Sequence, residues 1–167
     1  MTASPAPGRP KPGDVTSGDR PRYAAAQGPT FQQQRAIRFS DCDPAAIVFY
    51  PQYFVMFNAL VEDWVTDALG IGYRHLVVER RIGLPTVRLE VDFQAVSRMG
   101  DKVLLSLDVE RLGRRSITLA LRCSGDDGAP RMSMRQVLVT TSLDTHASID
   151  IPADLRAAIV RSAGLSD

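Results

Sequence analysis

Cysteine and histidine are scarce in this sequence, which has two of each in 167 residues: Cys42, Cys123, His75 and His146. Two isolated cysteines provide neither a disulfide framework nor a paired spacing of metal ligands, so we predict free thiols in a reducing cytoplasm. Neither histidine belongs to a metal-spaced cluster or to a nucleophile motif with serine or cysteine. The sequence thus predicts no metal site, and both histidines are expected to have structural or surface roles.

Long apolar runs and an excess of one charge are also absent. No run approaches the ~20 apolar residues that a membrane span needs, and the N-terminus lacks the compact apolar core of a signal peptide. We therefore expect no membrane partner and no export. The formal net charge is only +1, which argues against a domain that binds nucleic acid. Gly-rich phosphate loops of the Walker or Rossmann kind are missing as well.

Proline is distributed unevenly, because residues 1–30 contain six of the eleven prolines in the chain. Such a segment cannot bury enough apolar surface to offset the entropy lost on ordering, so we predict a disordered tail at 1–30. The remaining residues, 31–167, are sufficient for one domain with a sizeable core. The sequence therefore predicts a tail followed by a single folded domain.

The most prominent predicted element is a helix from about Pro51 to Leu69. Proline suits the first position of a helix, where its missing N–H is not needed, and Gly70 is typical of a C-terminal cap. The segment is apolar over most of its circumference, and its polar residues, including Asn58 and Glu62, form only a partial stripe. This pattern is typical of a central helix that other elements wrap.

Period-two alternation predicts strands after this helix, and turn-forming residues separate them, so neighbouring strands should pair antiparallel. The four predicted long strands are 85–97, 101–112, 116–123 and 131–143. A short strand is expected before residue 40, and a short helix is expected at 151–163. This succession predicts an α+β fold in which a curved antiparallel sheet surrounds the long helix.

Two aspartates, Asp41 and Asp43, lie in a tight Asp-x-Asp-Pro turn, and the apolar segment 47–49 separates them from the helix. A simple helix cap would lie directly against the helix. Asp43 can act as a nucleophile or as a general base for water, and a nearby helix dipole would keep it ionised. The backbone N–H of Tyr50 is a natural oxyanion donor, because Pro51 has no N–H to donate. The turn therefore predicts cleavage of an ester or thioester.

Residues 41–53 read Asp-Cys-Asp-Pro-Ala-Ala-Ile-Val-Phe-Tyr-Pro-Gln-Tyr. This motif resembles the signature of hotdog-fold acyl-CoA thioesterases, and most closely that of the 4-hydroxybenzoyl-CoA thioesterase family of the Pseudomonas type. The likeness extends more weakly over residues 32–158. It implies a hotdog fold, in which a five-stranded antiparallel sheet wraps a long helix.

The same resemblance implies a set of functional residues. Asp43 would be the catalytic carboxylate, and the Tyr50 amide would polarise the thioester carbonyl. Arg114 and Arg115 fall where basic residues of the family contact the phosphates of coenzyme A. No separate cofactor is implied, since coenzyme A is part of the substrate. The family also implies a homo-oligomer, commonly a dimer of dimers, with active sites at the dimer interface.

Two positions depart from the family pattern: Ala46 replaces the usual glycine, and Asn58 stands where the hydroxybenzoyl enzymes carry an aspartate that helps hold the phenolic hydroxyl. An asparagine can bind that hydroxyl but adds no charge, so another aryl-CoA or a short-chain acyl-CoA fits almost as well. We expect Asp41 to brace the turn, Glu62 to face solvent or an interface, and Cys42 to be a packing residue. The alternatives are a non-catalytic acyl-CoA-binding hotdog module and a hotdog hydratase, although the motif lacks the histidine that a hydratase usually needs.

Overall fold

The computed structural model describes residues 30–165, so the tail predicted at 1–30 lies outside the described residues except for Thr30. The strands and helices alternate irregularly along the chain. The strands are β1 Phe31–Ala36, β2 Ile82–Gly83, β3 Thr86–Phe93, β4 Lys102–Leu112, β5 Ser116–Gly125, β6 Pro130–Val139 and β7 Thr141–Ser142. The helical segments are η1 Phe39–Asp41, α1 Pro51–Asp63, η2 Trp64–Ala68, η3 His75–Glu79 and α2 Ala153–Ala163.

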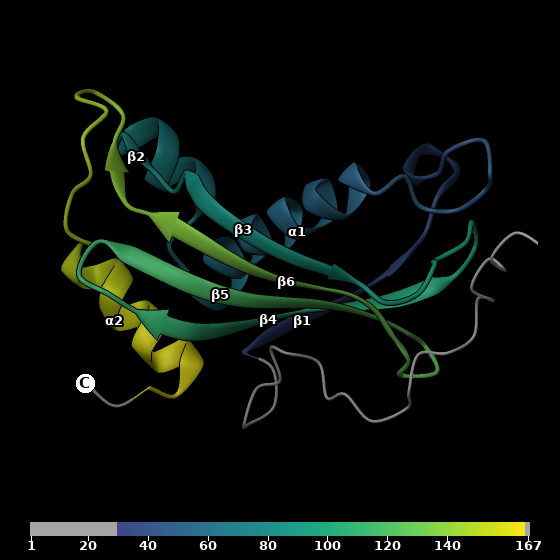
Figure 1. The fold of residues 1–167 in the computed structure, drawn as a ribbon. Helices are drawn as coiled ribbons and strands as arrows, with labels where there is room; N and C mark the ends of the chain where they lie inside the picture. Colours follow the sequence, from purple (N-terminus) through teal and green to yellow (C-terminus); the bar gives the residue numbers. More distant parts are fainter. Residues whose placement is uncertain (1–29, 166–167) are drawn as a thin grey trace, which may run out of the picture.

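Five strands form one antiparallel sheet in the order β1-β4-β5-β6-β3, and this sheet curves around α1 (Figure 1). The alternation along the central strands sends every second side chain toward the helix, where most of the buried apolar residues gather. The predicted sheet around a long helix is therefore confirmed. The edge positions belong to β1 and β3.

Two of the predicted strands are shorter than their sequence pattern. β3 ends at Phe93 because the backbone amides of Gln94 and Ala95 both donate to the carbonyl of Arg131, at 2.9 and 3.1 Å, which leaves the regular ladder. β6 ends at Val139, although the Thr140 amide still follows the β5 register and donates to the Arg115 carbonyl at 2.8 Å. The residues that follow form β7, which pairs with β2 in a separate two-stranded sheet.

The long helix occupies the predicted span, but its last turn widens. After α1 the chain continues as the π-helical segment η2, in which the Leu69 amide bonds the Trp64 carbonyl five residues earlier, at 3.0 Å. Gly70 then ends the helix with φ 66°, a conformation that glycine adopts without strain. At the same end, Trp64 is fully buried and its Nε1 donates to Ser162 Oγ of α2 at 3.3 Å.

The sheet leaves one side of the helix uncovered. The sheet covers the face that carries Tyr53, Met56, Phe57, Leu60 and Val61, which are all buried. The opposite side remains open, and Val55 is 59% exposed there. A single curved sheet encloses only part of a helix circumference, so the apolar residues of α1 exceed what one chain buries.

Candidate active site

The loop before α1 is held by Asp41, which is buried. Its carboxylate accepts hydrogen bonds from Arg35 Nη2, at 3.1 and 3.0 Å to the two oxygens, and from the Arg38 amide at 2.8 Å. Its carbonyl accepts the Phe49 amide at 2.9 Å. Asp41 therefore joins β1, the turn and the start of the helix, which agrees with the bracing role expected from the sequence.

Asp43 lies half-buried two residues further along, in a backbone turn of its own. Its amide donates to the Ile47 carbonyl at 3.0 Å, and its carbonyl accepts the Ala46 amide at 2.9 Å. Its Oδ1 accepts the Ala45 amide at 2.8 Å, whereas Oδ2 has no hydrogen-bond donor among residues 30–165. The turn thus fixes one carboxylate oxygen and leaves the other available to water or to a substrate.

Tyr50 lies at the N-terminus of α1, where the backbone amides have no partner within the helix. The neighbouring amides of Phe49, Gln52 and Tyr53 each bond a carbonyl of this loop. Within the described part of the chain, the Tyr50 amide has no acceptor. Pro51, the first helical residue, has no N–H. The only unpaired amide of the junction is therefore the one predicted to bind an oxyanion, and the positive end of the helix dipole supports that role.

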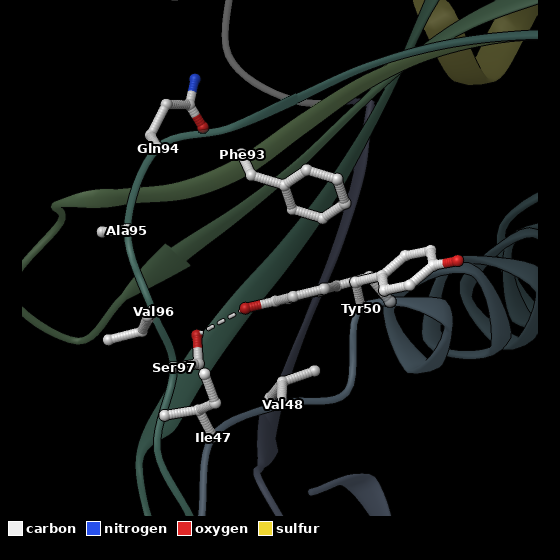
Figure 2. A pocket seen from close by; sticks show the side chains of 9 residues that line it. Ile47, Val48, Tyr50, Phe93, Gln94, Ala95, Val96 and Ser97 are labelled. Atoms are coloured by element: carbon white, nitrogen blue, oxygen red, sulfur yellow. Dashed lines mark hydrogen bonds between the residues drawn. The ribbon is translucent and has the colours of Figure 1, made fainter. Parts of the chain in front are cut away.

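A cavity of about 250 Å³ lies at this end of the helix, and its lining includes Tyr50, Tyr53, Phe93 and the loop 94–97 (Figure 2). The rings of Tyr50 and Phe93 meet edge to face, with 6.3 Å between their centroids. Tyr53 Oη bonds Ser97 Oγ at 2.9 Å, and both residues are buried. Burial raises the pKa of Tyr53, so its hydroxyl remains neutral. Aromatic rings therefore line much of the cavity, and the hydrogen bond between Tyr53 and Ser97 fixes two of its lining side chains.

Asp43 does not itself line this cavity, although the adjoining Ile47 and Val48 do. Val48 is held by its amide, which donates to the Ser97 carbonyl at 2.9 Å, and Asp43 is held by its bond to Ile47. The structure therefore places Asp43 and Tyr50 in one short, well-connected loop. Tyr50 lines the cavity, and Asp43 is bonded to Ile47, which also lines it.

The thiol between the two aspartates is a poor nucleophile. Burial raises the pKa of Cys42, and the negative charges of Asp41 and Asp43 raise it further. Burial also raises the pKa of Cys123 to about 12. Both cysteines are free. These environments keep the two thiols protonated near neutral pH, in agreement with the packing role expected for Cys42.

Asn58 lies two turns further along α1, on the rim of a second cavity of about 300 Å³. Polar side chains from four parts of the fold meet there, namely Glu62 of α1, Tyr73 of the segment before η3, Thr86 of β3 and Gln136 of β6. Burial and the charge of Glu62 raise the pKa of Tyr73. Sequence reasoning missed Gln136, although a signal exists: it is a polar residue at a helix-facing position of a strand whose other such positions are apolar.

Arg114 and Arg115 lie in the β4–β5 turn, at the opposite end of the sheet from Asp43 (Figure 1). The Asp43 loop is tied to the start of β4, where the Met99 amide donates to the Ala46 carbonyl at 3.1 Å. The turn follows the end of that strand, and eleven residues span about 35 Å. Both arginines are exposed and share Asp150, at 3.5 and 2.7 Å. One chain therefore does not bring them near Asp43.

Residues 30–165 contain no group of three or more histidine, cysteine or acidic side chains arranged to hold a metal. None of the helices in that range combines the length and the apolar character needed to cross a membrane.

Residues 37–159 match the model of the Thioesterase-like superfamily. A 1,4-dihydroxy-2-naphthoyl-CoA hydrolase of Synechococcus elongatus is 34% identical over 95 residues, 56% of this chain and 69% of that protein. The 4-hydroxybenzoyl-CoA thioesterase of Pseudomonas sp. is 28% identical over 128 residues, 72% of this chain and 91% of that protein. A solved gentisyl-coenzyme A thioesterase superposes with a TM-score of 0.69 at 25% identity, covering 77% of this chain and 99% of that one. These matches confirm the expected hotdog fold, but they do not single out the Pseudomonas type.

Proposed function

The chain belongs to the thioesterase-like superfamily and is a thioester hydrolase, and we propose that it cleaves an aryl-coenzyme A to the free acid and coenzyme A. One observation supports the proposal most strongly. The unpaired amide of Tyr50 and the carboxylate of Asp43, with only one of its two oxygens hydrogen-bonded, lie in one loop before α1 that Asp41 holds in place. The two free cysteines suit the reducing cytoplasm predicted from the sequence.

The loop supplies the two groups that thioester hydrolysis requires. The substrate carbonyl oxygen accepts a hydrogen bond from the Tyr50 amide, which stabilises the negative charge that develops there; one such donor is typically worth about 10²–10³ in rate. Asp43 either removes a proton from the attacking water or attacks the carbonyl carbon itself, forming an anhydride that water then hydrolyses. In both routes the C–S bond breaks, and the coenzyme A thiolate leaves and takes up a proton.

An aromatic acyl group suits the lining of the site. Tyr50 and Phe93 present ring edges and faces to the cavity beside the oxyanion donor. The relatives named above act, by their names, on dihydroxynaphthoyl, hydroxybenzoyl and gentisyl thioesters, which are all hydroxylated aryl groups. Asn58 is available to bind a ring hydroxyl, as the resemblance to the hydroxybenzoyl enzymes suggested.

A second copy of the chain completes the site in this proposal. The edge strand β3 exposes Val87 by 61% and Leu89 by 44%, and α1 leaves Val55 exposed by 59%. Two β3 edges related by a two-fold axis pair antiparallel, which buries Val87 and Leu89. The Arg114 and Arg115 end of one chain then adjoins the Asp43 end of the other, so that the arginines can contact coenzyme A phosphates across the interface. We propose that two such dimers associate as a tetramer.

Substitution of Asp43 by asparagine tests the chemistry. Release of free thiol is measured for a panel of aryl-CoA, short-chain and long-chain acyl-CoA thioesters. Asp43→Asn is expected to lower kcat by about 10²–10⁴, because it removes the base or nucleophile, whereas Asp126→Asn in the exposed β5–β6 turn should match the wild type. Near-full activity of Asp43→Asn on the best substrate would refute the role of Asp43. Binding of acyl-CoA by the wild type without thiol release would favour the non-catalytic module. Incorporation of ¹⁸O into Asp43 during a single turnover in H₂¹⁸O distinguishes the nucleophile from the general base.

A further inference from the structure

Gln136 is an amide among apolar side chains. On the helix-facing side of β6 it follows Met132 and Met134 and precedes Leu138, which are all buried. Gln136 itself is only 3% exposed. An uncharged polar group in such a place is unfavourable unless both its donor and its acceptor are paired. A leucine or methionine at this position would avoid that cost, so the glutamine requires an explanation.

Of the two polar atoms of the Gln136 side chain, only one has a hydrogen-bond partner among the described residues. Nε2 donates to Thr86 Oγ1 at 2.7 Å. Oε1 is buried and has no donor among the described residues. A hydroxyl group can pair with either end of an amide, so a ligand hydroxyl satisfies the free end in either orientation of the side chain.

The surroundings of Gln136 indicate the kind of ligand. It lines the cavity of about 300 Å³ together with Asn58, Glu62 and Tyr73. The carboxylate of Glu62 on the rim disfavours an anionic group and favours a hydrogen-bond donor. Leu84 and Leu138 add apolar walls. A neutral hydroxyl carried on an apolar ring combines these properties, whereas a plain alkyl chain or a carboxylate does not.

The position of the cavity also matters in the proposed dimer, where the acyl group of a substrate bound at the partner chain's Tyr50 would reach it. Gln136 is four residues before Thr140, whose amide bonds the Arg115 carbonyl, so the cavity belongs to the arginine end of the sheet. In the antiparallel β3 dimer proposed above, this end adjoins the Tyr50 cavity of the partner. We infer that Gln136 accepts a hydrogen bond from a ring hydroxyl of the acyl group and thereby selects hydroxylated over unsubstituted aryl thioesters. This inference rests on the proposed function.

The test compares thioesters that differ by one hydroxyl, 4-hydroxybenzoyl-CoA against benzoyl-CoA and 1,4-dihydroxy-2-naphthoyl-CoA against 1-hydroxy-2-naphthoyl-CoA. In Gln136→Leu, the ratio of kcat/KM for the hydroxylated over the deoxy member should fall about 10-fold in at least one pair, while kcat/KM for the deoxy member is retained. Gln136→Met provides a second variant of unchanged length. Gln32→Leu, at an exposed position of β1, is the matched control and should keep the wild-type ratio. Thermal unfolding should show no loss of stability in Gln136→Leu, because the substitution removes an unpaired buried carbonyl.

Calorimetric titration with 4-hydroxybenzoate and benzoate measures how much the ring hydroxyl adds to binding affinity, without turnover. The wild type should bind the hydroxylated acid about 10-fold more tightly, and Gln136→Leu should lose this difference. An unchanged hydroxyl preference in active Gln136→Leu and Gln136→Met overturns the inference and leaves the proposed function standing. Failure of the wild type to hydrolyse any aryl thioester overturns the proposed function. In that case the binding of 4-hydroxybenzoate and benzoate alone tests the role of Gln136. Equal binding of the two acids by the wild type, or no binding of either, overturns the inference.

Discussion

Ala46 stores strain in the loop that carries Asp43, and replacement by glycine should release it. Its φ of 59° lies in the left-handed region, which a residue with a Cβ adopts at a cost of about 1–2 kcal/mol. The conformation is imposed from both sides: the Ala46 amide donates to the Asp43 carbonyl at 2.9 Å, and its carbonyl accepts the Met99 amide at 3.1 Å. This geometry suits the glycine that the family resemblance implies at this position of the motif.

The expected gain is smaller than the strain itself, because glycine also makes the unfolded chain more flexible. That flexibility costs about 0.4–1 kcal/mol of stability relative to alanine. The difference predicts that Ala46→Gly raises the free energy of unfolding by about 0.5–1 kcal/mol. For a chain of this size that corresponds to an increase of about 1–4 °C in Tm. Since the hydrogen bonds of Ala46 involve only its backbone, the loop should keep its path and Asp43 its position.

Urea denaturation and thermal unfolding measure this effect, with Ala45→Gly as the matched control. Ala45 is the preceding residue, is equally exposed, and does not have a positive φ. Its replacement changes only the flexibility of the chain and should therefore destabilise by about 0.4–1 kcal/mol. Opposite signs for the two variants support the reasoning. Equal destabilisation by both would show that Ala46 is not strained in solution.

Three further outcomes follow from other contacts. Tyr53→Phe should lower the free energy of unfolding by about 1–3 kcal/mol in urea titrations, because it leaves a buried serine hydroxyl without its partner; an unchanged midpoint would contradict this. The hydrogen bonds from Arg80 lower the pKa of Asp154, so they stabilise the fold above pH 3.8, and this effect is lost as the pH falls through the lowered pKa. The difference in free energy of unfolding between wild type and Arg80→Gln should therefore shrink as the pH falls below 3.8. A difference that does not change with pH would contradict this prediction. Leu89→Lys on the β3 edge should elute as an 18.3 kDa monomer in size-exclusion chromatography and show low activity, whereas Val78→Lys, at another exposed apolar residue, should keep the assembly of the wild type.

The fold could be predicted largely from local patterns. Pro51 and Gly70 mark the ends of the long helix, and alternation with turn residues marks β4 and β5 to within two residues of their ends. The end of β3 could not be predicted, because it depends on bonds between distant residues, namely those from the Gln94 and Ala95 amides to the Arg131 carbonyl. The π-helical turn of η2 likewise has no signal in the helical pattern.

The candidate site was predictable only where it is local. Asp43 and Tyr50 belong to one continuous motif, and their loop could be anticipated from the two aspartates and the proline. Gln136 could not be assigned, because its importance depends on Thr86, which lies fifty residues away in the sequence and satisfies only one end of its amide. The resemblance implied that Arg114 and Arg115 contact coenzyme A phosphates, and the length of β4 separates them from Asp43 of the same chain.

The proposed dimer would account for the distance between the predicted site residues Asp43 and Arg114 and for the exposed apolar edge of the sheet. A chain that buried the whole circumference of its helix would need more sheet than five strands provide, and a chain that completed its own site would need Arg114 close to Asp43. In the proposed dimer, antiparallel pairing of two β3 edges covers Val87 and Leu89 and brings the Arg114 end of one sheet to the Asp43 end of the other. Stability and activity should then depend on protein concentration in parallel. A diluted enzyme that becomes monomeric but retains its full kcat would show that each chain holds a complete site and that the edge has another use.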